Sequence, residues 1–194
     1  MPNKIQEAKA ALRKEMRARL TKLSREARAA AGAKLCERLQ DGEIWRGAKS
    51  VLLFAPLAGE PDVWALVQAG LAAKKNIGLP RFESTRAGYV AAQVGDLGRD
   101  IVTGKFQIRE PSASCPELAL AGFDLILVPG VAFDLRGRRL GRGRGFYDRL
   151  LTEVRGVKCG AAFDEQIVAS VPAEVHDAAV NCVVTPSQWV KIAD

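Results

Sequence analysis

The chain has 194 residues, of which 48% are hydrophobic and 26% are charged, and its formal net charge is +7. This composition excludes an intrinsically disordered chain, and the length is typical of one domain with a sizeable core. No apolar run approaches the roughly 20 residues of a membrane span, and the first residues lack the apolar core of a signal peptide. We therefore expect a cytoplasmic protein, a monomer or weak homo-oligomer, whose positive charge favours anionic partners: nucleic acid, a phosphorylated cofactor or a polyanionic substrate.

The cysteines and the histidine argue against two further classes of protein. The four cysteines are far apart in the sequence, and His176 is the only histidine. No Cys-x-x-Cys pair occurs, so neither a zinc site nor a disulfide framework is expected.

The first forty residues predict two helices that pack onto the rest of the domain. Apolar residues recur at spacings of three and four over 4–20, and a second helix over 27–39 has Ser24 as its cap. Lys9, Arg13 and Arg17 lie four residues apart and form a basic stripe on the first helix. This stripe is either a solvated face or a phosphate clamp.

Beyond residue 40, strands alternate with helices. We expect strands over 50–55, 76–80, 89–94, 123–128, 157–163 and 180–185, the second ended by Pro80 and the third at a sheet edge. Helices are expected from Pro61 to about 73 and over 146–154, and residues 95–118 are expected to be irregular. The alternation predicts a single α/β domain over residues 1–194, with a mainly parallel, open, Rossmann-like sheet flanked by helices.

A run of arginine and glycine separates the strand over 123–128 from the helix that follows it. Positions 136–145 hold five arginines, four glycines and one leucine. Glycines let backbone N–H groups approach an anion, and a helix N-terminus adds a favourable dipole, so the run predicts a phosphate-binding turn. It matches neither a Walker A loop nor the dinucleotide fingerprint. The alternative is a flexible, solvated basic loop.

Four acidic residues stand where they could take part in this chemistry. Asp134 precedes the run, Asp148 follows it, and Asp177 lies near the last strand; Mg²⁺ is usually held by one or two such carboxylates with phosphate oxygens. Asp148 has an alternative role at a helix N-terminus, and Asp134 can initiate a turn. Glu60 follows the first strand and either binds the amino-pyrimidine part of a heterocycle or serves as a helix-entry acid.

Together these residues resemble the 5-formyltetrahydrofolate cyclo-ligase family. The strongest match is the sequence PGVAFD at 129–134 followed by RLGRGRGFYD at 139–148, and weaker matches include KAALR at 9–13, IREP at 108–111 and PAEVHD at 172–177. The resemblance implies ATP- and Mg²⁺-dependent conversion of 5-formyltetrahydrofolate to 5,10-methenyltetrahydrofolate, with release of ADP and phosphate. The implied partners are the folate substrate and ATP, with neither nucleic acid nor membrane.

The resemblance also implies roles for individual residues. ATP would be bound by Lys9, Arg13 and the loop residues Arg139, Leu140, Gly141, Arg142, Gly143, Arg144, Gly145, Phe146 and Tyr147. Arg144 and Tyr147 would act in catalysis, and Asp148 and Asp177 would hold Mg²⁺. The folate would contact Phe54, Leu57, Glu60 and Tyr147.

Two segments depart from the family pattern. Gln107 stands where members commonly carry glycine, and residues 83–89 are dissimilar from the usual folate-contacting segment. These departures leave open a family member with a changed substrate. A basic Arg/Gly nucleic-acid-binding protein is a further alternative, although aromatic residues make up only 6% of the chain and no known RNA-binding pattern occurs.

Overall fold

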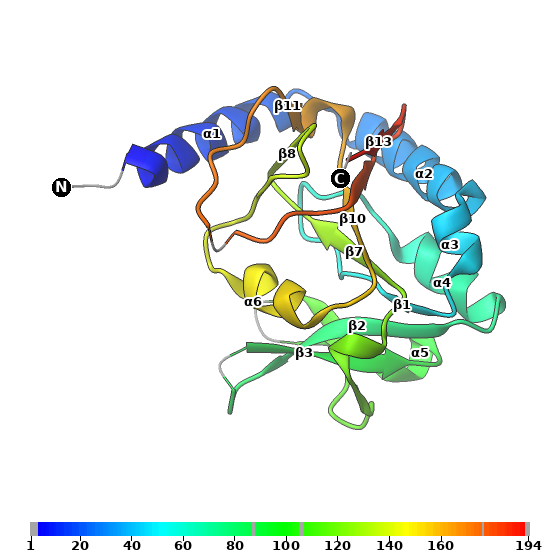
Figure 1. Ribbon diagram of the computed structural model, residues 1–194. Coiled ribbons are helices and arrows are strands. Elements are labelled where there is room, and N and C mark those ends of the chain that lie inside the picture. Colours follow the sequence, from blue (N-terminus) through cyan, green and yellow to red (C-terminus); the bar gives the residue numbers. More distant parts are fainter. Residues whose placement is uncertain (1–3, 87, 105–106, 176, 193–194) are drawn as a thin grey trace.

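An eight-stranded mixed sheet forms the centre of the computed structural model, which describes residues 4–86, 88–104, 107–175 and 177–192 (Figure 1). Its strands lie in the order β13 (Trp189–Lys191), β12 (Cys182–Val184), β10 (Val157–Ala161), β7 (Leu125–Pro129), β1 (Ser50–Leu52), β2 (Asn76–Glu83), β3 (Gly88–Val94) and β6 (Glu117–Leu118). From β12 to β2 all neighbours are parallel, and β3, β6 and β13 pair antiparallel. The predicted α/β fold with a mainly parallel sheet is confirmed.

Helices cover both faces of this sheet. α2 (Arg25–Asp41), α3 (Glu43–Gly47) and α4 (Trp64–Ala72) pack on one face, and α6 (Phe146–Glu153) packs on the other (Figure 1). Side chains alternate along β7 accordingly, because Leu125 and Leu127 belong to the first core and Ile126 and Val128 to the second. The parallel strands are therefore buried on both sides, as their near-continuous apolar sequences require.

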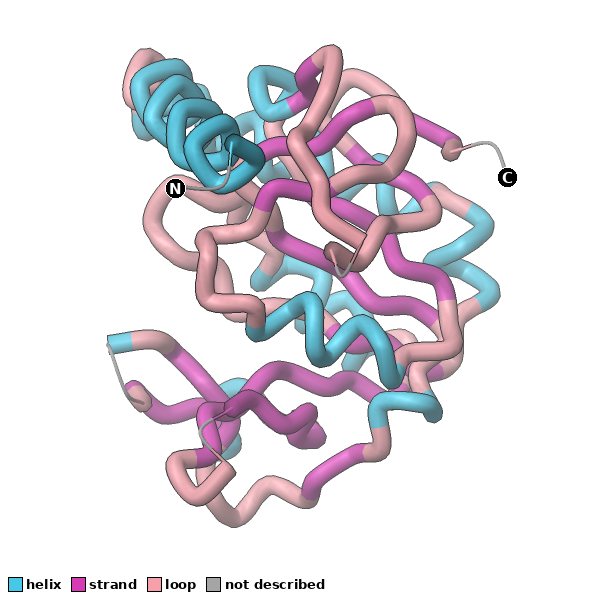
Figure 2. The backbone as a smooth tube through the Cα atoms, turned by 60° about the vertical axis from the view of Figure 1, so that its left-hand side comes forward, coloured by secondary structure: helices cyan, strands magenta, loops and turns pink. Residues whose placement is uncertain are grey.

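α1 (Lys4–Leu20) lies outside the main sheet. It packs through the fully buried Met16 on a small three-stranded sheet of β8 (Ala132–Asp134), β9 (Arg139–Leu140) and β11 (Ile167–Val168). Figures 1 and 2 both show α1 at the outer edge of the molecule. The two predicted N-terminal helices are confirmed, and the Ser24 hydroxyl oxygen accepts the Ala27 N–H at 3.1 Å as the cap of α2. None of the described helices is long and apolar enough to cross a membrane.

The Arg/Gly run is not one continuous loop, which corrects the sequence-based interpretation. Arg136 to Arg138 form the turn of a β8–β9 hairpin, and Arg139 and Leu140 are the buried strand β9. Gly137 has a φ of +76°, a conformation that favours glycine, and its N–H donates to the Asp134 carbonyl at 3.1 Å. The free loop is thus only residues 141–145.

Several predicted boundaries and one position in the sheet were wrong; β1, for example, ends at Leu52 and not at residue 55. β2 continues through Pro80 to Glu83. The Leu53 N–H donates to the Gly78 carbonyl, so Gly78 and, two residues later, Pro80 have their backbone polar groups on the side of β1. Because β1 ends at Leu52, no strand needs an N–H from Pro80 on that side, and β2 can continue through the proline. The helix expected from Pro61 begins at Trp64, because the Asp62 carboxylate accepts the Trp64 N–H instead of entering the first turn. β3 is not an edge strand, since β6 covers it.

Residues 95–118 contain short elements that the sequence did not reveal. They are α5 (Leu97–Asp100), β4 (Ile101–Thr103), β5 (Arg109–Pro111) and β6, with 105–106 outside the described residues. β4 and β5 pair as an antiparallel ribbon beside β2. α3 and β13 and the 3₁₀ turns η2 (Leu120–Gly122) and η3 (Asp164–Gln166) were also not predicted, because each is too short to show a periodic pattern.

Candidate functional site

The loop over 141–145 is shaped by its glycines and by α1. Gly143 and Gly145 have φ values of +94° and +65°, and Gly145 is the cap residue before α6. A Cβ on Gly143 would lie 3.4 Å from Nη2 of Arg13, whose Nε donates to the Gly141 carbonyl at 2.9 Å. The loop therefore needs small residues with left-handed backbone conformations, and Arg13 fixes it from the side.

A cavity of about 500 Å³ opens on one side of this loop. Its wall combines the segment after β1, part of β2 and β3, and the loop itself. All three predicted folate contacts from the first half of the chain, Phe54, Leu57 and Glu60, line it. Arg142, Arg144, Phe146 and Tyr147 line it from the loop side. The sequence correctly placed the Glu60 segment and the Arg/Gly loop at the same sheet edge, where ligands bind in open α/β folds.

Glu60 is held inside this cavity by two partners. Its Oε1 accepts from Nε of Arg142 at 2.9 Å and forms an ion pair with Nη2 of the same side chain at 2.9 Å, and its Oε2 accepts the Leu57 N–H at 2.9 Å. The Glu60 side chain is only 6% exposed, whereas that of Arg142 is 50% exposed. The Arg142 side chain therefore lies toward Glu60 but stays half exposed, so its guanidinium can leave this ion pair and contact solvent or a ligand.

Aromatic rings form much of the remaining wall. Tyr89 contacts Phe146 edge to face, with ring centroids 5.1 Å apart, and contacts Phe82 at 5.5 Å. Burial, and next the charge of Glu60, raise the pKa of Tyr147, while Arg139 partly opposes this shift. Tyr147 is accordingly a neutral phenol near neutral pH, able to donate a hydrogen bond but not to act as an ionised base.

A second cavity, of about 680 Å³, lies on the other side of the loop, between α1 and α6. Most of its lining residues are polar or charged. The lining includes the predicted residues Lys9, Arg13, Leu140 and Asp177, together with Gln6, Arg149, Thr152, Glu153 and Glu174. Arg17, the third member of the basic stripe, is exposed and does not line it. The stripe is thus divided between a cavity wall and a solvated face.

Lys9 is nearly buried in this second cavity. Its Nζ donates to Asp177 Oδ2 at 2.6 Å and to Glu174 Oε2 at 2.9 Å, and its side chain is 7% exposed. Burial alone would lower the pKa of Lys9, but the hydrogen bonds that its ammonium donates to Asp177 and Glu174, with their negative charge, outweigh burial and raise the pKa. The ammonium is therefore fixed and charged at the cavity wall.

The two cavities share a wall made of Arg139, Gly141, Gly143, Gly145 and Asp148. The Arg139 side chain is 3% exposed, and its Nη2 donates to Asp148 Oδ1 at 2.5 Å. The buried Nε of Arg139 has no hydrogen-bond partner among the described residues. Arg139 is therefore a buried cation with unused donor capacity at the junction of the two cavities.

The carboxylates fit a bound divalent cation only in part. The described residues contain no cluster of three or more His, Cys, Asp or Glu side chains suited to a metal ion. Asp148 and Asp177 do line the same cavity, each paired with a cation, which is compatible with Mg²⁺ that arrives bound to a polyphosphate. The phosphates would then replace the carboxylates as partners of Arg139 and Lys9.

Asp134 lines neither cavity and has a structural role. Its buried carboxylate accepts the N–H groups of Arg136, Arg138 and Val171 and pairs with Nε of Arg138. The turn-forming alternative considered for Asp134 is therefore the one that the structure supports. This residue fixes the hairpin from which Arg139 and the loop extend.

Several lining residues were not found from the sequence. Tyr89 and Ile108 line the first cavity, and Gln6 and Glu174 line the second. Tyr89 and Ile108 lie in segments that sequence patterns left irregular or at an edge. Glu174 had a usable signal, because it is a second acid three residues before Asp177.

Comparisons with known proteins all point to one family. Residues 5–186 match the model of the 5-formyltetrahydrofolate cyclo-ligase family. A 5-formyltetrahydrofolate cyclo-ligase of Escherichia coli K12 is 34% identical over 145 residues, covering 73% of this chain and 80% of the relative. The mouse enzyme of that name is 28% identical over 188 residues, covering 91% and 93%.

A solved structure shows the same fold. The NMR structure of 5,10-methenyltetrahydrofolate synthetase from Aquifex aeolicus superposes with a TM-score of 0.86 at 33% identity, covering 96% of this chain and 93% of that one. The chain belongs to the 5-formyltetrahydrofolate cyclo-ligase family, whose named members are ligases.

Proposed function

We propose that this protein converts 5-formyltetrahydrofolate to 5,10-methenyltetrahydrofolate, using ATP and Mg²⁺ and releasing ADP and phosphate. The observation that carries the proposal is the wall shared by the two cavities, with the buried Arg139 at their junction. The first cavity combines aromatic rings with Glu60 on the side away from the shared wall, and the second is lined mainly by charged residues. A heterocycle on one side and a polyphosphate on the other would meet at this wall.

The first cavity suits the pterin. Phe54, Leu57 and Tyr147 supply flat apolar walls, and Glu60 supplies a carboxylate that accepts hydrogen bonds from an amino-pyrimidine. Arg142 already neutralises Glu60, so the substrate would compete with this arginine or share the carboxylate with it. Tyr147, as a neutral phenol, would donate a hydrogen bond to the substrate.

The second cavity suits the phosphates of ATP. Lys9 and Arg13 would contact them from α1, and the backbone of Gly141 to Gly145 would follow the chain of phosphates. Asp148 and Asp177 would hold Mg²⁺, which when bound neutralises charge on the phosphate oxygens. Arg139, with a buried unpartnered Nε, would stabilise the group in transit between the cavities.

The reaction needs no protein nucleophile. The formyl oxygen attacks the terminal phosphorus of ATP, the bond between this phosphorus and the ADP oxygen breaks, and an imino-phosphate forms. The N10 atom then attacks the activated formyl carbon and closes the ring. N10 gives up its proton to solvent or to the departing phosphate, which leaves with the former formyl oxygen. The protein would mainly position the two substrates and neutralise charge, for which Arg139, Arg144 and Lys9 are placed along the cavities.

The test is an assay of the purified protein with 5-formyltetrahydrofolate, ATP and Mg²⁺. We expect ADP release that depends on both the folate and the metal, and absorbance of methenyltetrahydrofolate that rises in step with it. Absence of both products would contradict the proposal. Binding of ATP without turnover of this folate would instead indicate a family member with a changed substrate, as the departures at Gln107 and over 83–89 would allow.

A further inference from the structure

Glu174 connects α1 to the loop that precedes β12. Its Oε2 accepts from Nζ of Lys9 at 2.9 Å and from Nε2 of Gln6 at 2.5 Å, and all three residues line the second cavity. Its side chain is 17% exposed; the contact with Lys9 is partly buried, whereas the contact with Gln6 is exposed to solvent. Glu174 therefore connects two side chains of α1 to a segment more than 160 residues away.

Lys9 has two acidic partners, Asp177 and Glu174, and only the first has a proposed role with the metal ion. Asp177 Oδ2 accepts from Lys9 at 2.6 Å and also from the Glu174 N–H at 2.6 Å, so the three residues form one cluster. An ammonium has three donors, and the two carboxylates use two of them. The third can be given to a ligand in the cavity. Asp177 is also the carboxylate proposed for the metal ion, whereas Glu174 has no such assignment.

We propose that Glu174 is a positioning residue that holds the Lys9 ammonium toward the phosphates of ATP while Asp177 serves the metal ion. This inference rests on the proposed function and deepens it. A nearly buried ammonium that lost Asp177 to a metal ion would keep Glu174 as its one acceptor among the described residues. The Gln6 contact keeps this acceptor in place on the face of α1.

The direction in which Glu174→Gln changes ATP affinity distinguishes a positioning role from simple charge repulsion. Glu174 is an anion beside a site proposed for a polyanion, so direct repulsion alone predicts that Glu174→Gln binds ATP more tightly. Positioning predicts the opposite, because the variant keeps the side-chain shape but weakens a charge-assisted hydrogen bond to Lys9. Loss of such a bond corresponds to about a tenfold weaker affinity.

The experiment measures ATP affinity by calorimetry in the presence of Mg²⁺ and without folate, using the full chain. Glu174→Gln should bind ATP about tenfold more weakly than the wild type, and in the assay KM for ATP should rise more than kcat falls. In a Lys9→Met background the same change should have little further effect, because its action passes through Lys9. Glu7→Gln is the charge control, since Glu7 is exposed on α1 and lines neither cavity, and it should change affinity by no more than about threefold.

Three results would overturn the inference. Glu174→Gln could bind ATP as tightly as the wild type or more tightly, or it could weaken binding equally with and without Lys9. In these two cases the wild type still binds ATP, so the proposed function stands. A wild type that binds no ATP would remove both the proposed function and the inference drawn from it.

Discussion

Replacing Asp134 by asparagine tests whether this residue is structural, as its contacts indicate. The Asp134 side chain is fully excluded from solvent and lies in the hairpin that carries Arg139. Its Oδ1 accepts the N–H groups of Arg136 and Arg138 at 2.9 and 3.1 Å. Its Oδ2 accepts the Val171 N–H at 2.8 Å and Nε of Arg138 at 2.6 Å.

The size of the effect follows from these contacts. An asparagine can keep the two hydrogen bonds at Oδ1. Its amide nitrogen then faces the Val171 N–H and Nε of Arg138, two donors from which Oδ2 accepts in the wild type. The loss is one neutral hydrogen bond of about 1 kcal/mol and one charged bond of about 2 kcal/mol. The Arg138 side chain is 30% exposed, so we take the low end of the range for breaking a buried ion pair and expect about 3 kcal/mol of lost stability.

The effect should depend on pH in a known direction. Burial raises the pKa of Asp134, but the hydrogen bonds from Val171, Arg136 and Arg138 outweigh it and lower the pKa below its ordinary value. A carboxylate with a lowered folded-state pKa stabilises the fold fully above its unfolded pKa of about 3.9, and this contribution is lost as pH falls through the folded pKa. The difference between wild type and Asp134→Asn should thus be largest at neutral pH and shrink below about pH 4.

Urea unfolding followed by circular dichroism measures this difference at neutral and acidic pH. Asp41→Asn, at an exposed position in α2, is the control and should change the free energy of unfolding by less than about 0.5 kcal/mol. A loss below about 1 kcal/mol for Asp134→Asn at neutral pH would refute the reasoning. So would a loss that stays constant into the acidic range.

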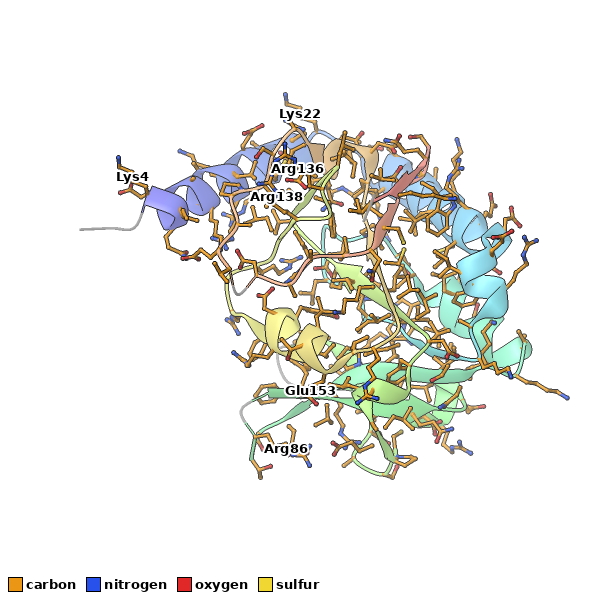
Figure 3. The ribbon with its side chains drawn as sticks, viewed as in Figure 1. Lys4, Lys22, Arg86, Arg136, Arg138 and Glu153 are labelled. Carbon is orange, nitrogen blue, oxygen red and sulfur yellow. The ribbon has the colours of Figure 1, made fainter. Side chains whose placement is uncertain are left out.

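Three further substitutions probe the site and the backbone near it. Arg144→Ala should abolish turnover without changing the urea midpoint, because Arg144 is exposed and lines the first cavity, whereas Arg136→Ala in the hairpin turn should keep turnover (Figure 3). Glu60→Ala should raise KM for the folate more than KM for ATP; an equal rise would place Glu60 away from the pterin. Gln107→Gly should stabilise the fold by about 0.5 to 1 kcal/mol in urea unfolding, because Gln107 has a φ of +59°, and Gln93→Gly in the extended strand β3 should do the opposite.

Local sequence patterns were sufficient where one segment decides its own structure. The period of apolar residues over 4–20 and the Ser24 cap predicted α1 and α2, since both signals act within a few turns of helix. The glycines of the 141–145 loop predicted a turn before a helix, because left-handed conformations at Gly143 and Gly145 depend on the residues themselves. The sheet edge shared by Glu60 and the loop followed from the parallel order of strands.

Contacts between distant segments were decided only by the tertiary structure. β2 passes through Pro80 because β1 ends before it, which no property of β2 reveals. Asp134, Asp148 and Asp177 were all candidate acids in the sequence, yet Asp134 is buried against its own hairpin while the other two line a cavity. Glu174 joins Lys9 across more than 160 residues. Sequence fixes backbone preferences that act locally, but the desolvation and pairing of a charge depend on neighbours that only folding brings together.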